Sequence, residues 1–117
     1  MRRMLIIEDE PDIQECLRDF FSSRGFSVTT AFSGEEALER LEEGSAEVIL
    51  LDILLPGISG LEVLKRIKEI RPRTKVIMVT GLSHPTLRVE AQACGASGYV
   101  TKPFDFSDQT WAPVLAL

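Results

Sequence analysis

Short apolar runs alternate with segments of helical periodicity along the chain, five times over. Most of these runs carry hydrophobic residues at consecutive positions, which is typical of strands covered on both faces of a sheet. Polar residues, Gly or Pro soon follow each run, as expected where a strand ends. The pattern predicts strands at Met4–Ile7, Phe26–Ala31, Glu47–Leu51, Lys75–Val79 and Ser97–Val100.

The segments between these strands carry start and stop signals for helices. Pro11 suits a first helical turn, because its missing N–H group would have no intrahelical partner there. Ser33 and Ser59 are each followed three residues later by Glu, which matches a capping box. The first helix has one apolar stripe, formed by Ile13, Cys16, Leu17, Phe20 and Phe21. Helices are predicted to end near Gly25, Gly44, Pro72 and Gly95, and the fourth, from about Pro85 to Cys94, is the least periodic.

This alternation predicts an α/β fold with a parallel sheet and helices on both faces. Right-handed crossovers leave few arrangements, and a doubly wound, flavodoxin-like, five-stranded sheet of order 2-1-3-4-5 fits five βα units best. The chain of 117 residues has room for one core. We therefore expect residues 1–117 to form a single domain.

Composition narrows the possible functions. Thirteen basic and 18 acidic residues give a net charge of −5, which argues against direct contact with nucleic acid. The longest apolar run, broken by Asp52, is too short to cross a bilayer, and the N-terminus lacks a signal-peptide pattern. A cytoplasmic location is expected. Cys16 and Cys94 have no metal-like or redox-like spacing, so both are predicted to be buried structural thiols.

Polar residues gather where four of the predicted strands end. In open α/β sheets, function lies just beyond the carboxyl ends of the strands, near the point where the strand order reverses. Three carboxylates, one hydroxyl and one ammonium group are expected at this edge, from Glu8, Asp9, Asp52, Thr80 and Lys102. Singly, such residues are often helix caps, turn formers or solvated loop residues. Their joint placement indicates a site.

The charges of this group indicate its chemistry. Three neighbouring carboxylates raise one another's pKa values, and a divalent cation removes that cost. Hard oxygen ligands with room for water suit Mg²⁺. Lys102 adds a second positive charge that can pair with Asp52 or with a phosphoryl group. A carboxylate can act as the nucleophile in phosphoryl transfer, and Asp52, on the central strand, is the natural candidate.

Several motifs resemble the receiver domain of bacterial two-component response regulators. They are the pair Glu8-Asp9, the stretch from Leu50 to Gly60 around Asp52, Thr80, and the stretch from Gly95 to Phe104 around Lys102. The resemblance spans residues 4 to 104. It implies a signalling switch rather than an ordinary enzyme, one that catalyses its own phosphorylation and dephosphorylation within a phosphorelay.

The resemblance also implies residue roles. Asp52 would accept the phosphoryl group from a histidine kinase or a phosphotransfer protein. Mg²⁺ would be bound by Asp9, Asp52 and the backbone carbonyl of Leu54, with Glu8 acting through water. Thr80 and Lys102 would contact the phosphoryl group, Thr80 and Tyr99 would form the switch, and the Lys102–Pro103 bond would be cis.

The chain departs from this family after Phe104. Receivers usually end in an amphipathic fifth helix, but the segment from about residue 105 is poorly periodic, and Pro113 would break a helix interior. A short, kinked or displaced last helix is expected, with Trp111 covering the core. The family's homodimer surface uses the fourth and fifth helices and the fifth strand, so it is affected by this departure.

Two other functions fit the same architecture. One is a receiver-like module that binds partners without phosphorylation, and the intact set of five site residues argues against it. The other is a flavin-binding protein, which needs a phosphate-binding loop after the first strand, where Glu8, Asp9 and Glu10 would repel a phosphate. The kinase, the output, and the choice between a stand-alone regulator, an excised domain and part of a hybrid kinase stay open.

Overall fold

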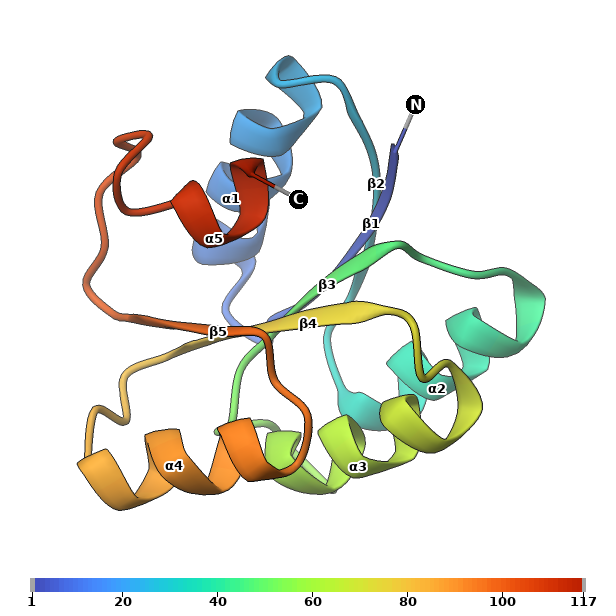
Figure 1. Ribbon diagram of the computed structural model, residues 1–117. Helices are drawn as coiled ribbons and strands as arrows, with labels where there is room; N and C mark the ends of the chain where they lie inside the picture. The colour runs from blue at the N-terminus through green and yellow to red at the C-terminus, as the bar shows by residue number, and fades with distance from the viewer. Residues whose placement is uncertain (1, 117) are drawn as a thin grey trace.

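Five parallel strands form one sheet of order β2-β1-β3-β4-β5 (Figure 1), as the sequence predicts. The computed structural model describes residues 2–116. The bounds differ from the predicted ones by one or two residues at several strand ends. The strands are β1 (Arg2–Ile7), β2 (Phe26–Ala31), β3 (Val48–Leu51), β4 (Lys75–Thr80) and β5 (Gly98–Thr101).

The helices cover both faces of this sheet (Figure 1). On one face lie α1 (Pro11–Ser23) and the short α5 (Ala112–Leu115). On the other face lie α2 (Gly34–Glu43), α3 (Gly60–Ile70) and α4 (Pro85–Ala93). Within the described residues, no helix combines the length and the apolar character needed to cross a bilayer.

Strand β3 is apolar at every position, and so are residues 4–7 of β1 and 76–79 of β4, because both faces of these segments are buried. Alternate side chains enter two separate hydrophobic clusters, as the two-residue period of a strand requires. On the side of α2, α3 and α4 lie Leu5, Ile7, Ile49, Leu51, Val76 and Met78. On the side of α1 and α5 lie Met4, Ile6, Val48, Leu50, Ile77 and Val79.

The predicted capping serines begin their helices. The Oγ atom of Ser33 accepts a hydrogen bond from the Glu36 amide at 3.1 Å, and that of Ser59 accepts one from the Glu62 amide at 3.3 Å. The Glu36 carboxylate accepts from the Phe32 amide, one residue before the cap. Each serine thus satisfies one otherwise unpaired amide at a helix N-terminus.

The prediction of two buried thiols is wrong for Cys16. Its side chain is exposed, Cys94 is partly buried, and both are free thiols. The buried residues of α1 are Gln14, Leu17 and Phe21, so the inward stripe passes through Gln14 rather than Cys16. Cys16 is adjacent to Leu17 in the sequence, and an apolar spacing pattern does not distinguish the edge of a stripe from its centre.

The segment after Phe104 forms a loop, a single helical turn and an aromatic cluster, in agreement with the expectation of a short last helix. Trp111 is fully buried, which confirms that it covers the core. Its ring packs nearly perpendicular to Phe21 and Phe104, with centroid separations of 5.2 and 5.1 Å. Its indole N–H donates to the Asp105 carbonyl at 2.8 Å. Trp111 therefore anchors the segment to α1 by packing on Phe21, and its hydrogen bond to Asp105 holds the loop within the segment together.

The Asp105 carboxylate organises the loop before α5. Its Oδ1 atom accepts from the hydroxyls of Ser107 and Thr110, both at 2.7 Å, and from the Ser107 amide at 3.0 Å. These bonds, the hydroxyl of Ser107 first, lower the pKa of Asp105 from 3.8 to about 2. A depressed folded-state pKa adds stability above the unfolded value, and that stability is lost as the pH falls toward 2.

We therefore expect Asp105→Asn to lower the thermal unfolding midpoint at pH 7, with a difference from wild type that shrinks as the pH falls below 4. Thermal unfolding followed by Trp111 fluorescence between pH 7 and pH 3 measures this. Asp19→Asn is the control, because the Asp19 side chain is 70% exposed and lies 3.8 Å from Arg18. If the thermal midpoints of Asp105→Asn and wild type differ by the same amount at every pH, the ionised Asp105 carboxylate is not what stabilises the loop.

Candidate functional site

The carboxyl ends of β1, β3, β4 and β5 meet at one edge of the sheet. Glu8 and Asp9 follow β1, Asp52 follows β3, Thr80 ends β4, and Lys102 follows β5. The ligand oxygens of Glu8, Asp9 and Asp52 all lie within 4.8 Å of one another. The three predicted carboxylates therefore form one acidic cluster.

Lys102 lies against this cluster. Its Nζ atom is 2.7 Å from Glu8 Oε1 and 2.7 Å from Asp52 Oδ2. The side chains of Glu8 and Asp52 are 1% and 5% exposed, and that of Lys102 is 14% exposed. Burial alone would lower the pKa of Lys102, but hydrogen bonds to Asp52 and Glu8 outweigh it and raise that pKa. Lys102 is thus a fixed positive charge at neutral pH.

One ammonium group does not fully offset the cost of burying the Glu8 carboxylate. Burial raises the pKa of Glu8 above its usual 4.5. The hydrogen bonds from Lys102 and from the Glu10 amide lower the pKa in part, and the charge of Asp52 raises it again. The pair favours the charged form of Lys102, whereas burial keeps the pKa of Glu8 above its usual value. More positive charge would stabilise the ionised cluster.

The donor set fits a hard divalent cation such as Mg²⁺. It offers carboxylate oxygens from three side chains, two buried and one, Asp9, exposed to solvent. Mg²⁺ favours few carboxylates and retains several waters, so an open side toward solvent suits it. The Leu54 amide donates to Asp52 Oδ1 at 3.1 Å, which fixes the carboxylate from the backbone side.

The loop after Asp52 folds back tightly onto the start of α3. The Gly60 amide donates to the Ile53 carbonyl at 2.8 Å. A Cβ atom on Gly60 would lie 2.0 Å from the backbone oxygen of Asp52 and 2.6 Å from the Cα of Ile53. Only glycine fits there, so Gly60 lets α3 begin directly against the Asp52 backbone.

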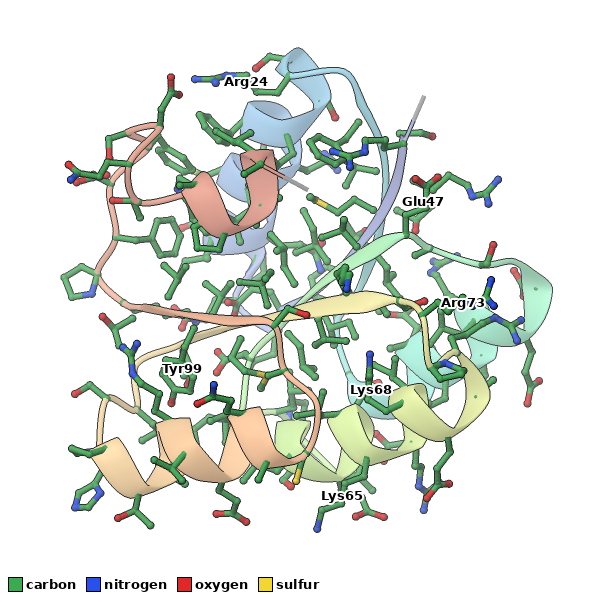
Figure 2. All side chains as sticks on the ribbon, in the orientation of Figure 1. Arg24, Glu47, Lys65, Lys68, Arg73 and Tyr99 are labelled. Atoms are coloured by element: carbon green, nitrogen blue, oxygen red, sulfur yellow. The ribbon has the colours of Figure 1, made fainter. Side chains whose placement is uncertain are left out.

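Thr80 and Tyr99 both contact the backbone of Leu82. The Thr80 hydroxyl, fully buried, accepts from the Leu82 amide at 3.3 Å. The Tyr99 hydroxyl donates to the Leu82 carbonyl, and the Arg88 guanidinium lies 4.8 Å above the Tyr99 ring. Figure 2 shows Tyr99 between β5 and α4. The Lys102–Pro103 bond is cis, in agreement with the expectation.

Three residues near the cluster were not among the predicted site residues. Glu10 brings a fourth carboxylate, with Oε1 at 3.5 Å from Lys102 Nζ, although its side chain is 61% exposed. Gln14 bonds the backbone beside Glu8, and Gly60 packs on Asp52. A signal existed for Gln14, because it stands three and seven residues before Leu17 and Phe21, in the spacing of a buried stripe.

The comparisons with known proteins agree with this geometry. The family model for the response regulator receiver domain matches residues 4–110. The chain belongs to this family. The transcriptional regulatory protein DltR of Streptococcus agalactiae is 41% identical over 103 residues, which is 88% of this chain and 46% of DltR. The regulatory protein AtoC of Escherichia coli is 35% identical over 108 residues, 92% of this chain and 23% of AtoC. The receiver domain thus spans less than half of these relatives.

Solved structures share the fold. The response regulator TrrA of Thermotoga maritima, solved in complex with Mg²⁺ and BeF, matches with a TM-score of 0.84 and 38% identity over 96% of both chains. A CheY-like receiver domain protein of Methanospirillum hungatei matches with a TM-score of 0.88 and 31% identity, over 93% of this chain and 87% of that one. This receiver domain is therefore a signalling module of two-component systems.

Proposed function

We propose that this receiver domain takes a phosphoryl group onto Asp52, beside a bound Mg²⁺ ion, from a histidine kinase or a phosphotransfer protein. One observation carries the proposal. The buried Asp52 carboxylate lies 2.7 Å from Lys102 Nζ and belongs to the same carboxylate cluster as Glu8 and Asp9. A nucleophile, a fixed cation and a set of metal ligands thus share one edge of the sheet.

Each residue has a distinct role in the proposed transfer. An Asp52 oxygen bonds to phosphorus as the bond from phosphorus to the donor's histidine nitrogen breaks. Lys102 Nζ moves from the carboxylates to a phosphoryl oxygen and neutralises its charge. Asp9, Asp52 and the Leu54 carbonyl would hold Mg²⁺, with Glu8 acting through water. The ion would supply further positive charge to the phosphoryl oxygens.

The same groups would serve the hydrolysis of the aspartyl phosphate. Water attacks the phosphorus of the aspartyl phosphate, the bond to Asp52 breaks, and inorganic phosphate leaves. The domain would thereby catalyse its own phosphorylation and dephosphorylation without acting on another substrate. We place this activity in the cytoplasm.

The conformational switch is proposed to run through Leu82. The Thr80 hydroxyl accepts a hydrogen bond from the Leu82 amide, and the Tyr99 hydroxyl donates one to the Leu82 carbonyl. If the Thr80 side chain moves toward Asp52 to donate to a phosphoryl oxygen, its oxygen leaves the Leu82 amide and the loop before α4 is free to move. Burial raises the pKa of Tyr99, only partly offset by Arg88, so its phenol stays a neutral donor that can follow the loop. Two arrangements of similar energy are then enough for switching.

For the switch, we expect Thr80→Ala to accept the phosphoryl group while losing the loop response. Hydrogen exchange of the amides in residues 81–84 is measured with and without a beryllofluoride complex, which stands in for the phosphoryl group. Wild type is expected to change its exchange rates on addition, and Thr80→Ala is not. Thr74→Ala is a control, because Thr74 is buried, donates to the Ala46 carbonyl, and lies at the opposite end of β4 from Thr80. An unaltered response in Thr80→Ala would refute this switch.

The proposal is tested by intact mass after incubation with a small phosphodonor and Mg²⁺. Wild type should gain about 80 Da, the mass of one phosphoryl group on a carboxylate. Asp52→Asn should gain nothing, since an amide oxygen is a poor nucleophile. Asp12→Asn, which alters an exposed carboxylate in the first turn of α1, should label like wild type. A wild type that never labels would favour the phosphorylation-independent binding module.

Homodimerisation stays a prediction. The surface expected from the family combines α4, β5 and α5, and here α5 contains only residues Ala112–Leu115. Val89 on α4 is 65% exposed, so an apolar side chain is available on this surface. Sedimentation of the phosphorylated and unphosphorylated protein tests whether the shortened helix still supports a dimer.

A further inference from the structure

Gln14 is a buried polar residue in an otherwise apolar stripe. It is 5% exposed, and the other buried residues of α1 are Leu17 and Phe21. A buried amide is unfavourable unless it forms hydrogen bonds, and a Leu or Met would fill such a position without that cost. The hydrogen bonds of the Gln14 side chain therefore explain why a polar residue occupies this buried position.

Both hydrogen bonds of the Gln14 amide nitrogen go to the backbone next to the acidic cluster. Its Nε2 atom donates to the Glu8 carbonyl at 3.1 Å and to the Ala31 carbonyl at 3.0 Å. The Ala31 carbonyl also accepts from the Glu8 amide at 3.1 Å. The last paired residues of β1 and β2 are Ile7 and Ala31. Gln14 thus extends the connection between these strands one residue beyond the sheet.

The Glu8 carbonyl belongs to the peptide group that joins Glu8 to Asp9. Fixing that carbonyl fixes the orientation of the peptide, and with it the directions in which the two side chains leave the backbone. Asp9 is exposed, and within the described residues its carboxylate forms no hydrogen bond or ion pair, so its position depends on its backbone. The peptide on the far side of Asp9 leads directly into Glu10 and the start of α1 at Pro11.

We propose that Gln14 is a positioning residue for the divalent cation site, acting through the Glu8 carbonyl to hold the Glu8 and Asp9 carboxylates toward Asp52. This inference rests on the proposed function, because it assumes that the cluster binds Mg²⁺. Groups that contact and orient the metal ligands, but not the metal itself, commonly change metal affinity by 10- to 100-fold when they are removed. Gln14 would be such a group, although it touches neither the ion nor the phosphoryl group.

The test is a calorimetric titration with Mg²⁺ alone, without a phosphodonor. Gln14→Met has a similar shape and no donor, and we expect its Mg²⁺ dissociation constant to rise about 10-fold. Leu17→Val is the matched control, because Leu17 lies one turn further along the same buried stripe and contacts no site residue through hydrogen bonds. This control should lower the thermal midpoint while its dissociation constant stays within about twofold of wild type.

The outcomes separate this inference from the proposed function. If wild type binds no Mg²⁺, or Asp9→Asn binds it as well as wild type, both fail together. If wild type binds and Asp9→Asn does not, but Gln14→Met matches wild type, only the role of Gln14 is overturned. Should Gln14→Met not fold, Gln14→Asn replaces it, because the shorter amide keeps its donors but cannot reach both carbonyls. An unchanged dissociation constant in that variant also overturns the role.

Discussion

Replacing Lys102 with methionine is expected to lower the free energy of unfolding at pH 8 by about 3 kcal/mol in the absence of divalent ions. The physical reason is that Glu8 and Asp52 would stay buried without their cation. Their side chains are 1% and 5% exposed, and each lies 2.7 Å from Lys102 Nζ. Removing one partner of a buried ion pair leaves a charge that neither water nor protein compensates.

The loss should depend on pH in a defined direction. The pKa of Glu8 is raised by burial even in the presence of Lys102, and in Lys102→Met it loses the contacts that lower it. An acid whose folded-state pKa exceeds its unfolded value of 4.5 is stabilising below that value, and loses this contribution as the pH rises through the folded-state pKa. The difference between Lys102→Met and wild type should therefore be larger at pH 8 than at pH 5.

Urea unfolding followed by Trp111 fluorescence at pH 5 and pH 8 measures this effect. Lys65→Met is the control, because Lys65 is exposed on α3 and points away from the sheet (Figure 2). Its unfolding free energy should stay within about 0.5 kcal/mol of wild type. Addition of Mg²⁺ should return part of the lost stability to Lys102→Met. If Lys102→Met loses the same unfolding free energy at pH 5 and at pH 8, then Lys102 does not act by compensating the charge of the buried carboxylates.

Gly60→Ala is expected to lower the free energy of unfolding by about 3 kcal/mol, and to reduce phosphoryl uptake at Asp52 even in the folded protein. The added Cβ would lie 2.0 Å from the Asp52 backbone oxygen and 2.6 Å from the Ile53 Cα. Both atoms belong to the backbone, so no rotation of a side chain relieves the overlap. Either α3 or the segment that carries Asp52 has to move.

The matched control is Gly44→Ala. Gly60 is the first residue of α3, and Gly44 is the C-cap of α2, so both lie at helix termini. A Cβ atom on Gly44 would meet nothing within 4 Å. The φ of Gly44, −174°, is extended backbone that any residue adopts. Denaturant unfolding and phosphodonor labelling are measured on both variants. If Gly60→Ala is no less stable than Gly44→Ala and labels as fast as wild type, the close approach of α3 to Asp52 is not important for the site.

The fold could be predicted because its sequence signals are local. Strands buried on both faces require consecutive apolar residues, and Val48–Leu51 and Val76–Val79 supply them. Ser33 and Ser59 set the starts of two helices through bonds to residues three positions later. Once the strand order follows from the connections, the residues after each strand must meet at one edge. The cluster of Glu8, Asp9 and Asp52 followed from that argument.

Other features depend on contacts between distant residues, which spacing does not reveal. The orientation of α1 was misjudged at Cys16, because Gln14 turns inward to reach two backbone carbonyls that lie 6 and 17 residues away. The path of residues 105–111 depends on Trp111 packing against α1 and on the bonds that Asp105 accepts. A break in periodicity could predict a departure there, but not the conformation adopted.

The central claim is that Asp52 becomes a phosphoacceptor only when a divalent ion joins Lys102 in offsetting the charge of the carboxylate cluster. The most direct measurement is the time course of intact mass with a phosphodonor, in Mg²⁺ and in excess chelator, for wild type and Asp9→Asn. We predict a gain of about 80 Da for wild type in Mg²⁺, and no gain in chelator or for Asp9→Asn within the same time. Labelling at the same rate in chelator as in Mg²⁺ would contradict the claim.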